Sequence, residues 1–256
     1  MTKIGILGAR GRMGQMLLSE IGSGAFKAEL GAAIDRADGV TDNGMTITAD
    51  TAAGFGASDV LIDFTAPAAT RMHVELAADM KKPLVIGTTG LEEVDESALK
   101  AASEKSAVFY AANMSLGVNL LASLVEKVSK ILPPEDFDIE IFEAHHKHKV
   151  DAPSGTALLL GQAAALGRDV DLQDAMVPAR FGQVGARPEG AIGFSVFRGG
   201  DVVGDHTVTF AGEGERVELT HKASSRAIFA RGAIRAALWL KDKQAGFYTM
   251  RDMLDL

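Results

Sequence analysis

The sequence of 256 residues contains no cysteine. This absence excludes disulfides, thiolate nucleophiles, iron–sulfur clusters and zinc sites with cysteine ligands, and it is compatible with a reducing compartment. The chain also lacks a run of about 18 apolar residues, the length that a membrane-spanning helix needs. Its apolar N-terminal stretch is shorter than a signal peptide requires and is followed at once by Arg10 and Arg12. We therefore expect a cytoplasmic protein without a membrane partner.

Positive charge is scarce as well. Lysine and arginine number 26 against 34 aspartates and glutamates, and the net charge of -8 argues against a nucleic-acid partner. With 47% hydrophobic and 23% charged residues, the chain can bury a substantial core. Its length suits two modest domains. We expect residues 1–114, completed by 226–256, to form a dinucleotide-binding domain, and 115–225 to form a domain for substrate binding and oligomerisation.

The first half of the chain alternates short apolar runs with segments long enough for crossover helices. This alternation predicts an α/β fold with a Rossmann-like, doubly wound parallel sheet. Small and polar residues follow the third and fourth runs, where the carboxyl edge of such a sheet binds ligands. The expected strands are residues 3–7, 29–34, 60–64, 84–86 and 108–111.

The second half has a different pattern. A helix is expected from about Ser115 to Ile131, where Pro133 and Pro134 follow. Alternating apolar and polar residues then predict a second α+β domain with a mostly antiparallel or mixed sheet. Its expected strands are residues 137–143, 192–197, 207–210 and 216–221. We also expect helices over residues 154–166 and 225–240, the latter returning to the first domain, and a long surface connection over 167–190.

Three glycines lie in the segment Gly-Ala-Arg-Gly-Arg-Met-Gly, between the first expected strand and a helical run over residues 16–21. A dinucleotide-binding turn needs glycines for the tight turn, for close approach of a pyrophosphate and for helix–strand packing. The N–H groups of the following helix then face the phosphates. The candidate cofactor contacts are Gly8, Ala9, Arg10, Gly11, Arg12 and Met13.

Asp35 lies 21 residues beyond Gly14, at the end of the second expected strand. A carboxylate at this place accepts hydrogen bonds from an adenosine ribose. Arg36 follows it and could neutralise a 2′-phosphate, so both NADH and NADPH fit the pattern. The alternatives are a structural turn that binds no nucleotide, and a mononucleotide or flavin.

A basic loop leads into the helix expected from residue 154. It holds three histidines and two lysines within residues 145–149, and Ser154, Gly155 and Thr156 begin the helix. Free N–H groups at a helix start, fixed positive charge and imidazoles can together hold and protonate an anionic substrate. The alternative is a solvated surface charge cluster.

Histidines also raise the question of a metal site. We predict none, because the adjacent His145 and His146 point apart and Lys147 and Lys149 repel a cation. The remaining histidines, His73, His206 and His221, occur singly in helix or strand patterns, where we expect packing or surface positions.

These motifs together resemble the dihydrodipicolinate reductase family, also called 4-hydroxy-tetrahydrodipicolinate reductases, of bacterial lysine and diaminopimelate synthesis. The resemblance extends over essentially the whole chain, and the loop His-His-x-x-Lys-x-Asp-x-Pro-Ser-Gly-Thr-Ala is its most specific part. The residues that carry it are 8–14, 87–90, 111–115, 143–157 and 221–226.

The resemblance implies reduction of a cyclic imine dicarboxylate by hydride from NADH or NADPH. His145 matches the proposed proton donor and Lys149 a second catalytic residue. His146, Gly155 and Thr156 match substrate contacts. Further cofactor contacts are implied at Gly87, Thr88, Thr89, Ala111, Ala112, Asn113 and Met114. Homotetramers assembled through the sheet of the second domain are implied as well.

Two other functions remain open. One is a different NAD(P)-dependent dehydrogenase acting on an amino acid or its semialdehyde. The other is a regulator that binds NAD(P) without turnover. Another dehydrogenase would not account for paired histidines, a lysine and an anion-binding helix start in one loop, and steady consumption of NADPH with dihydrodipicolinate would exclude the regulator.

Overall fold

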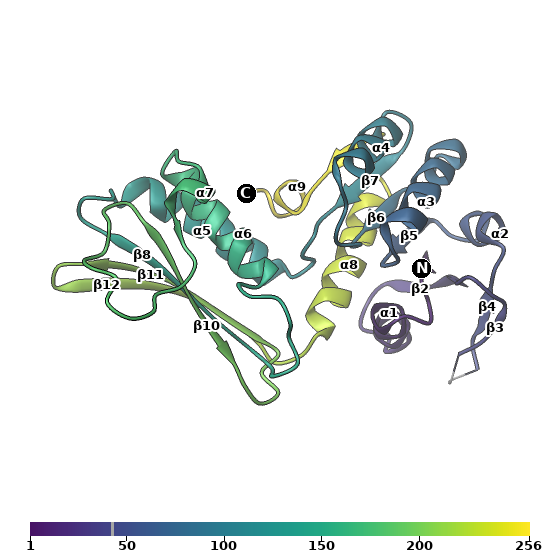
Figure 1. Cartoon of the computed structure of the whole chain (residues 1–256). Helices are drawn as coiled ribbons and strands as arrows, with labels where there is room; N and C mark the ends of the chain where they lie inside the picture. Colours follow the sequence, from purple (N-terminus) through teal and green to yellow (C-terminus); the bar gives the residue numbers. More distant parts are fainter. Residues whose placement is uncertain (42–43) are drawn as a thin grey trace. The chain divides into compact units, whose positions relative to one another are not determined.

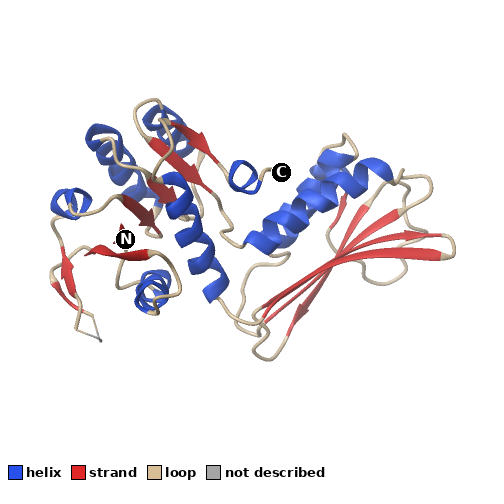
Figure 2. Ribbon diagram, turned by 180° about the vertical axis from the view of Figure 1, so that it is seen from behind, coloured by secondary structure: helices blue, strands red, loops and turns tan. Residues whose placement is uncertain are grey.

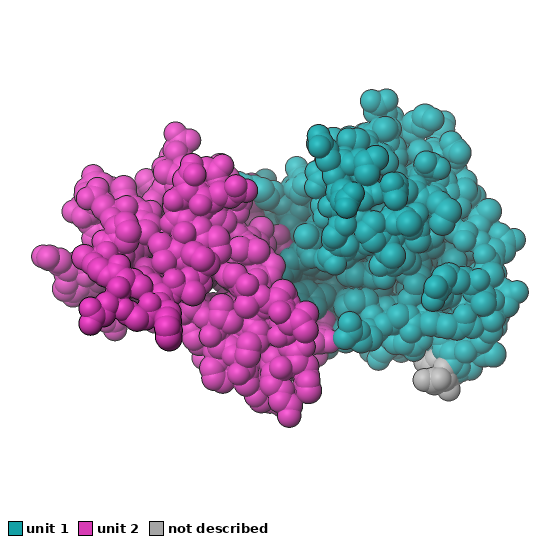
Figure 3. Space-filling view, in the orientation of Figure 1, with its two compact units in different colours: residues 1–116, 227–255 teal, residues 117–226, 256 magenta. Residues whose placement is uncertain are grey.

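A computed structural model describes residues 1–41 and 44–256 of the chain. These residues divide into two compact units (Figure 3). Unit 1 comprises Met1–Leu116 and Ala227–Asp255, and unit 2 comprises Gly117–Arg226 with Leu256. Unit 1 is therefore built from the two ends of the chain.

The described part of unit 1 is organised around an eight-stranded sheet in the order β13-β7-β6-β5-β1-β2-β4-β3. Its strand pairs are parallel apart from the short pair β3 and β4. The central strands are almost wholly buried, as expected for a parallel sheet covered on both faces. The strands are β1 (Thr2–Leu7), β2 (Ala28–Ile34), β3 (Gly39–Val40), β4 (Thr46–Thr48), β5 (Val60–Asp63), β6 (Leu84–Ile86), β7 (Ala107–Tyr110) and β13 (Gly246–Tyr248).

Helices cover both faces of this sheet. Apolar side chains of α1 (Arg12–Gly22) and α8 (Ala227–Leu240) pack on one face. Those of α2 (Thr51–Gly56), α3 (Pro67–Met80) and α4 (Glu93–Ser103) pack on the other. The short α9 (Met250–Leu254) ends the unit. Helix α8 packs on the same face as α1, although it follows unit 2 in sequence (Figure 1).

Unit 2 has a five-stranded sheet in the order β12-β11-β8-β10-β9. Its central strand β8 (Asp138–His145) pairs antiparallel with β11 (Gly204–Gly212) and parallel with β10 (Ile192–Arg198), so the sheet is mixed. The outer strands are β12 (Glu215–Ala223) and β9 (Met176–Val177).

The helices of unit 2 lie on one face of this sheet (Figure 2). Side chains of α5 (Leu116–Ile131), α6 (Gly155–Gly167) and α7 (Leu172–Ala175) pack there on the inward residues of the strands. Along β8 these inward residues are Ile139 and Ile141, followed by Glu143 and His145, all buried. On the opposite face Phe142 is 45% exposed. Apolar packing along one face of β8 therefore changes into a polar cluster at its end.

The predicted fold class is confirmed: a Rossmann-like parallel sheet with helices on both faces, and a second domain with a mixed sheet. The prediction that residues 167–190 form one connection is wrong in part. Helix α7 lies within it, capped by the Asp171 carboxylate, which accepts the Gln173 N–H at 2.8 Å, and β9 pairs with β10. Among the described residues no helix has the length and apolar composition to span a membrane.

Candidate active site

The glycine turn follows β1 directly. Gly8 has φ +80°, a conformation that glycine adopts without strain, and its carbonyl accepts the N–H of Gly11 at 2.9 Å. A Cβ on Gly14 would overlap the Gly8 carbonyl, so only glycine lets α1 pass this close to the turn. Gly11 is the N-cap of α1 and has no side chain, so the first-turn N–H groups have no capping side-chain oxygen. This arrangement suits a pyrophosphate.

Asp35 and Arg10 join the turn to the end of β2. The Asp35 carboxylate accepts the backbone N–H groups of Arg10 and Arg36, both at 2.8 Å. The Arg10 guanidinium in turn donates to the carbonyls of Ala37 at 2.7 Å and Asp38 at 3.0 Å. The Arg36 side chain is exposed. The structure thus brings these predicted residues together, and it shows that Asp35 and Arg10 also stabilise the loops that carry them.

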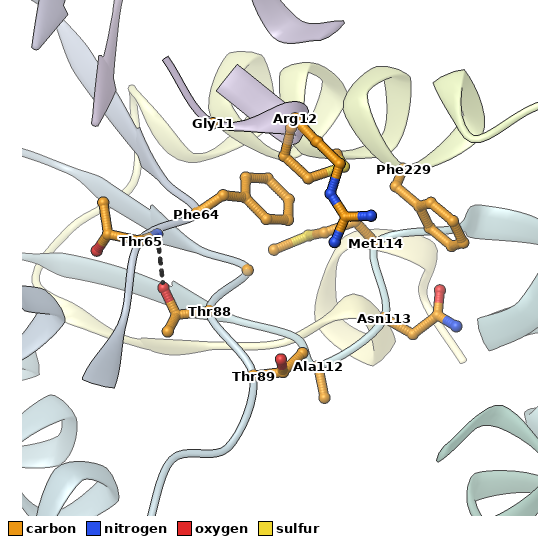
Figure 4. Close-up of a pocket in the computed structure, with 12 residues that line it drawn as sticks. Gly11, Arg12, Phe64, Thr65, Thr88, Thr89, Ala112, Asn113, Met114 and Phe229 are labelled. Carbon is orange, nitrogen blue, oxygen red and sulfur yellow. Dashed lines mark hydrogen bonds between the residues drawn. The ribbon is translucent and has the colours of Figure 1, made fainter. Parts of the chain in front are cut away.

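A cavity of about 460 Å³ lies at the carboxyl ends of β5, β6 and β7 (Figure 4). Its size is in the range of small-molecule sites. Nine predicted cofactor residues line it: Gly11, Arg12, Met13, Gly87, Thr88, Thr89, Ala112, Asn113 and Met114. The other lining residues are Phe64 and Thr65, at the carboxyl end of the third expected strand where a ligand was predicted, and Phe229, which sequence reasoning missed. The predicted residues Gly8, Ala9, Arg10, Asp35, Arg36 and Ala111 do not line it.

A buried polar network beside the cavity fixes its walls. Asp63, at the end of β5, is fully buried. Its carboxylate accepts the Thr65 N–H at 2.9 Å and the Thr65 hydroxyl at 2.6 Å, and it lies 2.8 Å from Nδ1 of His73. The Thr88 hydroxyl accepts the same Thr65 N–H at 3.2 Å (Figure 4). The loops after β5 and β6 are therefore tied together, and His73 has a role in this network beyond packing.

These residues fit a nicotinamide dinucleotide. The glycine turn offers backbone amides to the phosphates, and Asp35 lies at the end of β2, beside the turn. The cavity combines aromatic and apolar walls, from Phe64, Met114 and Phe229, with polar groups for an amide.

In unit 2 the Glu143 carboxylate is fully buried and surrounded by donors. The Arg198 guanidinium donates to both oxygens, at 2.8 and 2.7 Å, and the Ser154 N–H donates at 3.0 Å. Nδ1 of His145 lies 2.5 Å from Oε2. Burial by itself raises the pKa of Glu143, but the hydrogen bonds from Arg198, His145 and Ser154 outweigh it and hold that pKa below its usual range.

His145 packs against a second buried histidine. The ring of His206 meets the ring of His145 edge to face, with centroids 5.1 Å apart. Nε2 of His206 lies 3.1 Å from the Ser154 hydroxyl. Burial, with the nearby His145 adding to it, lowers the pKa of His206 to about 4, so this ring is neutral at pH 7. Sequence reasoning placed His206 among packing or surface residues and missed this contact.

Glu143, His145 and His206 have potential ligand atoms within 4.8 Å of one another. They do not suit a metal ion, because the carboxylate already accepts a guanidinium on both oxygens. A cation there would have to displace Arg198 and meet its charge. His146, the other histidine of the predicted pair, lies outside this group.

The other predicted residues lie in the loop that joins β8 to α6 and in the first turn of α6. Lys149 Nζ lies 2.8 Å from Asp151, and Nη2 of Arg226 lies 3.1 Å from Nε2 of His146. Partial desolvation and the nearby cations, Arg226 foremost, lower the pKa of His146. Ser154 caps α6 by accepting the Ala157 N–H at 3.1 Å, and Gly155 and Thr156 form its first turn. A helix start that follows directly on a loop with cationic side chains favours an anion.

Two family models match the chain in succession. The model for the N-terminus of dihydrodipicolinate reductase matches residues 2–114, and the model for its C-terminus matches residues 117–254. The chain belongs to the dihydrodipicolinate reductase family. It is 49% identical to the 4-hydroxy-tetrahydrodipicolinate reductase of Rhizobium rhizogenes, over 99% of this chain and 97% of the relative. It is 51% identical to that of Cereibacter sphaeroides, over 98% and 97%.

Solved structures share the fold. Dipicolinate-bound dihydrodipicolinate reductase from Paenisporosarcina sp. TG-14 is similar with a TM-score of 0.78 and 20% identity, over 98% of each chain. A diaminopimelate dehydrogenase of C. glutamicum is similar with a TM-score of 0.55 and 14% identity, over 97% of this chain and 92% of that one.

The low pKa of His206 predicts a specific loss of stability in acid. Its ordinary value is 6.5 and its folded value about 4, so between these pH values the unfolded chain binds a proton that the folded chain excludes. Stability therefore falls as the pH falls through this window. We expect the free energy of unfolding, measured with urea, to fall between pH 7 and pH 5 by about 2 kcal/mol more in the wild type than in His206→Gln. In His148→Gln, which changes an exposed side chain, the free energy of unfolding should depend on pH as in the wild type. The same pH dependence in the wild type and in His206→Gln would contradict the low pKa of His206.

Proposed function

We propose that this protein is an NAD(P)H-dependent oxidoreductase that reduces 4-hydroxy-tetrahydrodipicolinate to tetrahydrodipicolinate, in lysine and diaminopimelate biosynthesis. The observation that carries the proposal is the near 50% identity to proteins named 4-hydroxy-tetrahydrodipicolinate reductase along the whole chain. The two candidate sites support it. Unit 1 has a place for a nicotinamide dinucleotide, and unit 2 has a place for an anion beside a buried histidine.

Unit 1 holds the cofactor. The amides at the start of α1, around Gly11, take the pyrophosphate, and Asp35 takes the adenosine ribose. The nicotinamide occupies the cavity at the ends of β5 to β7, where Asn113 and the threonines orient its amide. When bound, the nicotinamide supplies the hydride, and the protein aligns it with the substrate.

Unit 2 holds the dicarboxylate. Gly155 and Thr156, at the start of α6, take one carboxylate together with His146. Lys149 stabilises negative charge on the substrate, and His145 donates the proton that the carbon accepts after reduction. A structural relative was solved with dipicolinate, a planar dicarboxylate of the same ring size.

We also propose that the protein is cytoplasmic and assembles as a homotetramer through the sheet of unit 2. The face of this sheet opposite the helices carries exposed apolar side chains, among them Phe142 at 45% and Phe197 at 47%. An apolar sheet face left open by one chain is stabilised when a second copy covers it.

The direct test follows absorbance at the nicotinamide band with enzymatically generated substrate and either cofactor. We expect turnover with both, and we expect His145→Gln to lower kcat by about 100-fold or more, the usual contribution of a general acid. The dissociation constant of NADPH should stay within about 2-fold, because His145 belongs to unit 2. The control is His148→Gln in the same loop, whose side chain is exposed.

An unchanged rate in His145→Gln would remove this residue from the mechanism. Tight NADPH binding without turnover by the wild type would favour the regulator. Turnover with an amino acid in place of the dicarboxylate would favour another dehydrogenase.

Cofactor discrimination should depend on Arg36. Its exposed guanidinium follows Asp35 directly and can neutralise a 2′-phosphate that NADH lacks. Arg36→Ala should therefore lower kcat/KM for NADPH about 10-fold more than for NADH, a difference of about 1.4 kcal/mol. Lys27→Ala removes an exposed cation at the opposite end of the same strand and should affect both cofactors equally. Equal losses in Arg36→Ala would place the 2′-phosphate elsewhere.

The assembly is tested by light scattering. The wild type should have the mass of four chains, and Phe142→Glu should dissociate into smaller species because it introduces charge on the open sheet face. Leu166→Glu introduces the same charge at the end of α6, which packs on the other face, and should leave the tetramer intact. A wild type that is monomeric at all concentrations would exclude the assembly.

A further inference from the structure

The Glu143 carboxylate connects three separate segments of unit 2. It belongs to β8, two residues before His145. Arg198, at the end of β10, donates to both of its oxygens, and the N–H of Ser154 donates from the start of α6. Arg198 also donates to the Asp151 carbonyl at 2.6 Å, within the loop that joins β8 to α6. The ring of His145 is therefore held in a fixed position relative to the first turn of α6.

The hydrogen-bond partners of Glu143 define which nitrogen of His145 carries a proton. Each oxygen of the carboxylate faces Arg198, and each faces one further group: the Ser154 N–H on Oε1 and the His145 ring on Oε2. Arginine and a backbone amide can only donate. The carboxylate is thus an acceptor in all four contacts, and the proton between it and His145 belongs to Nδ1.

The opposite nitrogen of the ring, Nε2, lies beside Gly204. A Cβ at this position would lie 3.0 Å from Nε2, closer than most side-chain contacts, so glycine leaves room next to this nitrogen. His206, whose ring meets the ring of His145 edge to face, is neutral at pH 7 and adds no charge there. Nε2 is therefore the nitrogen at which His145 exchanges a proton.

We infer that Glu143 is a positioning residue for proton transfer, acting through His145, and that Arg198 holds Glu143 in place for this task. The inference rests on the proposed function in taking His145 as the proton donor. Glu143 is fully buried and both of its oxygens already have donors, so it acts on the substrate through the His145 ring.

The step balances without a proton on Glu143. The enamine-like carbon of the reduced substrate supplies the electron pair of the new C–H bond. The N–H bond at Nε2 breaks, and its electron pair stays on the nitrogen. The proton on Nδ1 remains in its hydrogen bond to Glu143 throughout, and water returns a proton to Nε2 after product release. The form of the ring that donates is the imidazolium, which carries a proton on each nitrogen, so Nε2 can release its proton while the Nδ1 proton stays on its acceptor.

Glu143→Gln tests this arrangement with nearly unchanged shape. The glutamine amide has one oxygen and one NH₂ group, so the NH₂ group replaces one of the two carboxylate oxygens and faces the donors there. If the NH₂ group points toward His145, Nδ1 must lose its proton to accept a hydrogen bond from it. The matched control is Glu140→Gln. Glu140 lies three residues earlier on β8 and binds Arg180 through both oxygens, at 2.9 and 2.8 Å, but makes no contact with His145.

The first readout is the ¹⁵N NMR spectrum of the histidine rings in the full-length, ¹⁵N-histidine-labelled protein, with His145→Gln used for assignment. We expect neutral His145 of the wild type and of Glu140→Gln to carry its proton on Nδ1, and that of Glu143→Gln to carry it on Nε2. This readout needs no substrate, so it remains decisive even if the proposed reaction is absent. A wild type with the proton on Nε2 would overturn the inference.

The second readout is kinetic. Glu143→Gln should lower kcat about 100-fold while leaving the KM for NADPH within about 3-fold. In this variant the solvent deuterium isotope effect on kcat should rise, because proton transfer then limits the rate. For the same reason, the kinetic isotope effect measured with 4-deuterated NADPH should fall toward one. Glu140→Gln should match the wild type in all of these.

Glu143→Asp keeps an ionised acceptor and should recover part of the rate together with the Nδ1 proton. Glu143→Asp also provides a test if Glu143→Gln does not fold. If a variant of Glu143 loses rate but keeps the wild-type isotope effects and the wild-type ¹⁵N spectrum of His145, Glu143 has only a structural role. Wild-type kcat in Glu143→Gln would contradict the inference outright.

Discussion

The candidate substrate site depends on one buried ion pair, between Glu143 and Arg198. A carboxylate removed from water is strongly destabilising unless charge and hydrogen bonds compensate it. Here a guanidinium, a backbone N–H and an imidazole together supply them. Because these donors come from β10, the start of α6 and the end of β8, the compensation itself determines how the three segments meet. The hydrogen bonds that stabilise the buried carboxylate therefore also hold the segments of the candidate substrate site together.

Unit 1 uses a second buried carboxylate in the same way. Asp63 ends β5 as Glu143 nearly ends β8, and both follow apolar residues of a strand. Asp63 accepts hydrogen bonds from Thr65 in its own loop and contacts His73 from α3, and Thr88 joins the next loop to this network. Two walls of the cavity in unit 1 are fixed by these bonds. In both units the buried face of a strand thus ends in a carboxylate whose hydrogen-bond partners come from other segments of the candidate sites.

The main strands and the residues of the basic loop could be predicted from the sequence, because the patterns that indicate them lie within short continuous segments. Hydrophobic periodicity located the main strands, and His145, His146, Lys149 and the start of α6 lie in one continuous loop. Arg198 and His206 could not be found in this way. They follow His145 by more than 50 residues and reach it through strand register, in which His206 lies opposite Glu143 and Arg198 opposite His145. Phe229 likewise reaches the cavity only because α8 returns to unit 1.

Strand alternation nevertheless held a usable signal. Val208 and Phe210 are buried on the inward face of β11, and counting back by two brings His206 to the same face. On β8 the same count from Ile139 and Ile141 leads to Glu143, whereas Glu140 falls on the other face and stays partly exposed with its arginines. Both glutamates bind arginine, yet a charged residue on an inward position is rare unless it is paired. The parity of a residue in its strand, more than its type, therefore distinguishes the buried carboxylate that contacts His145 from one that binds arginine near the surface.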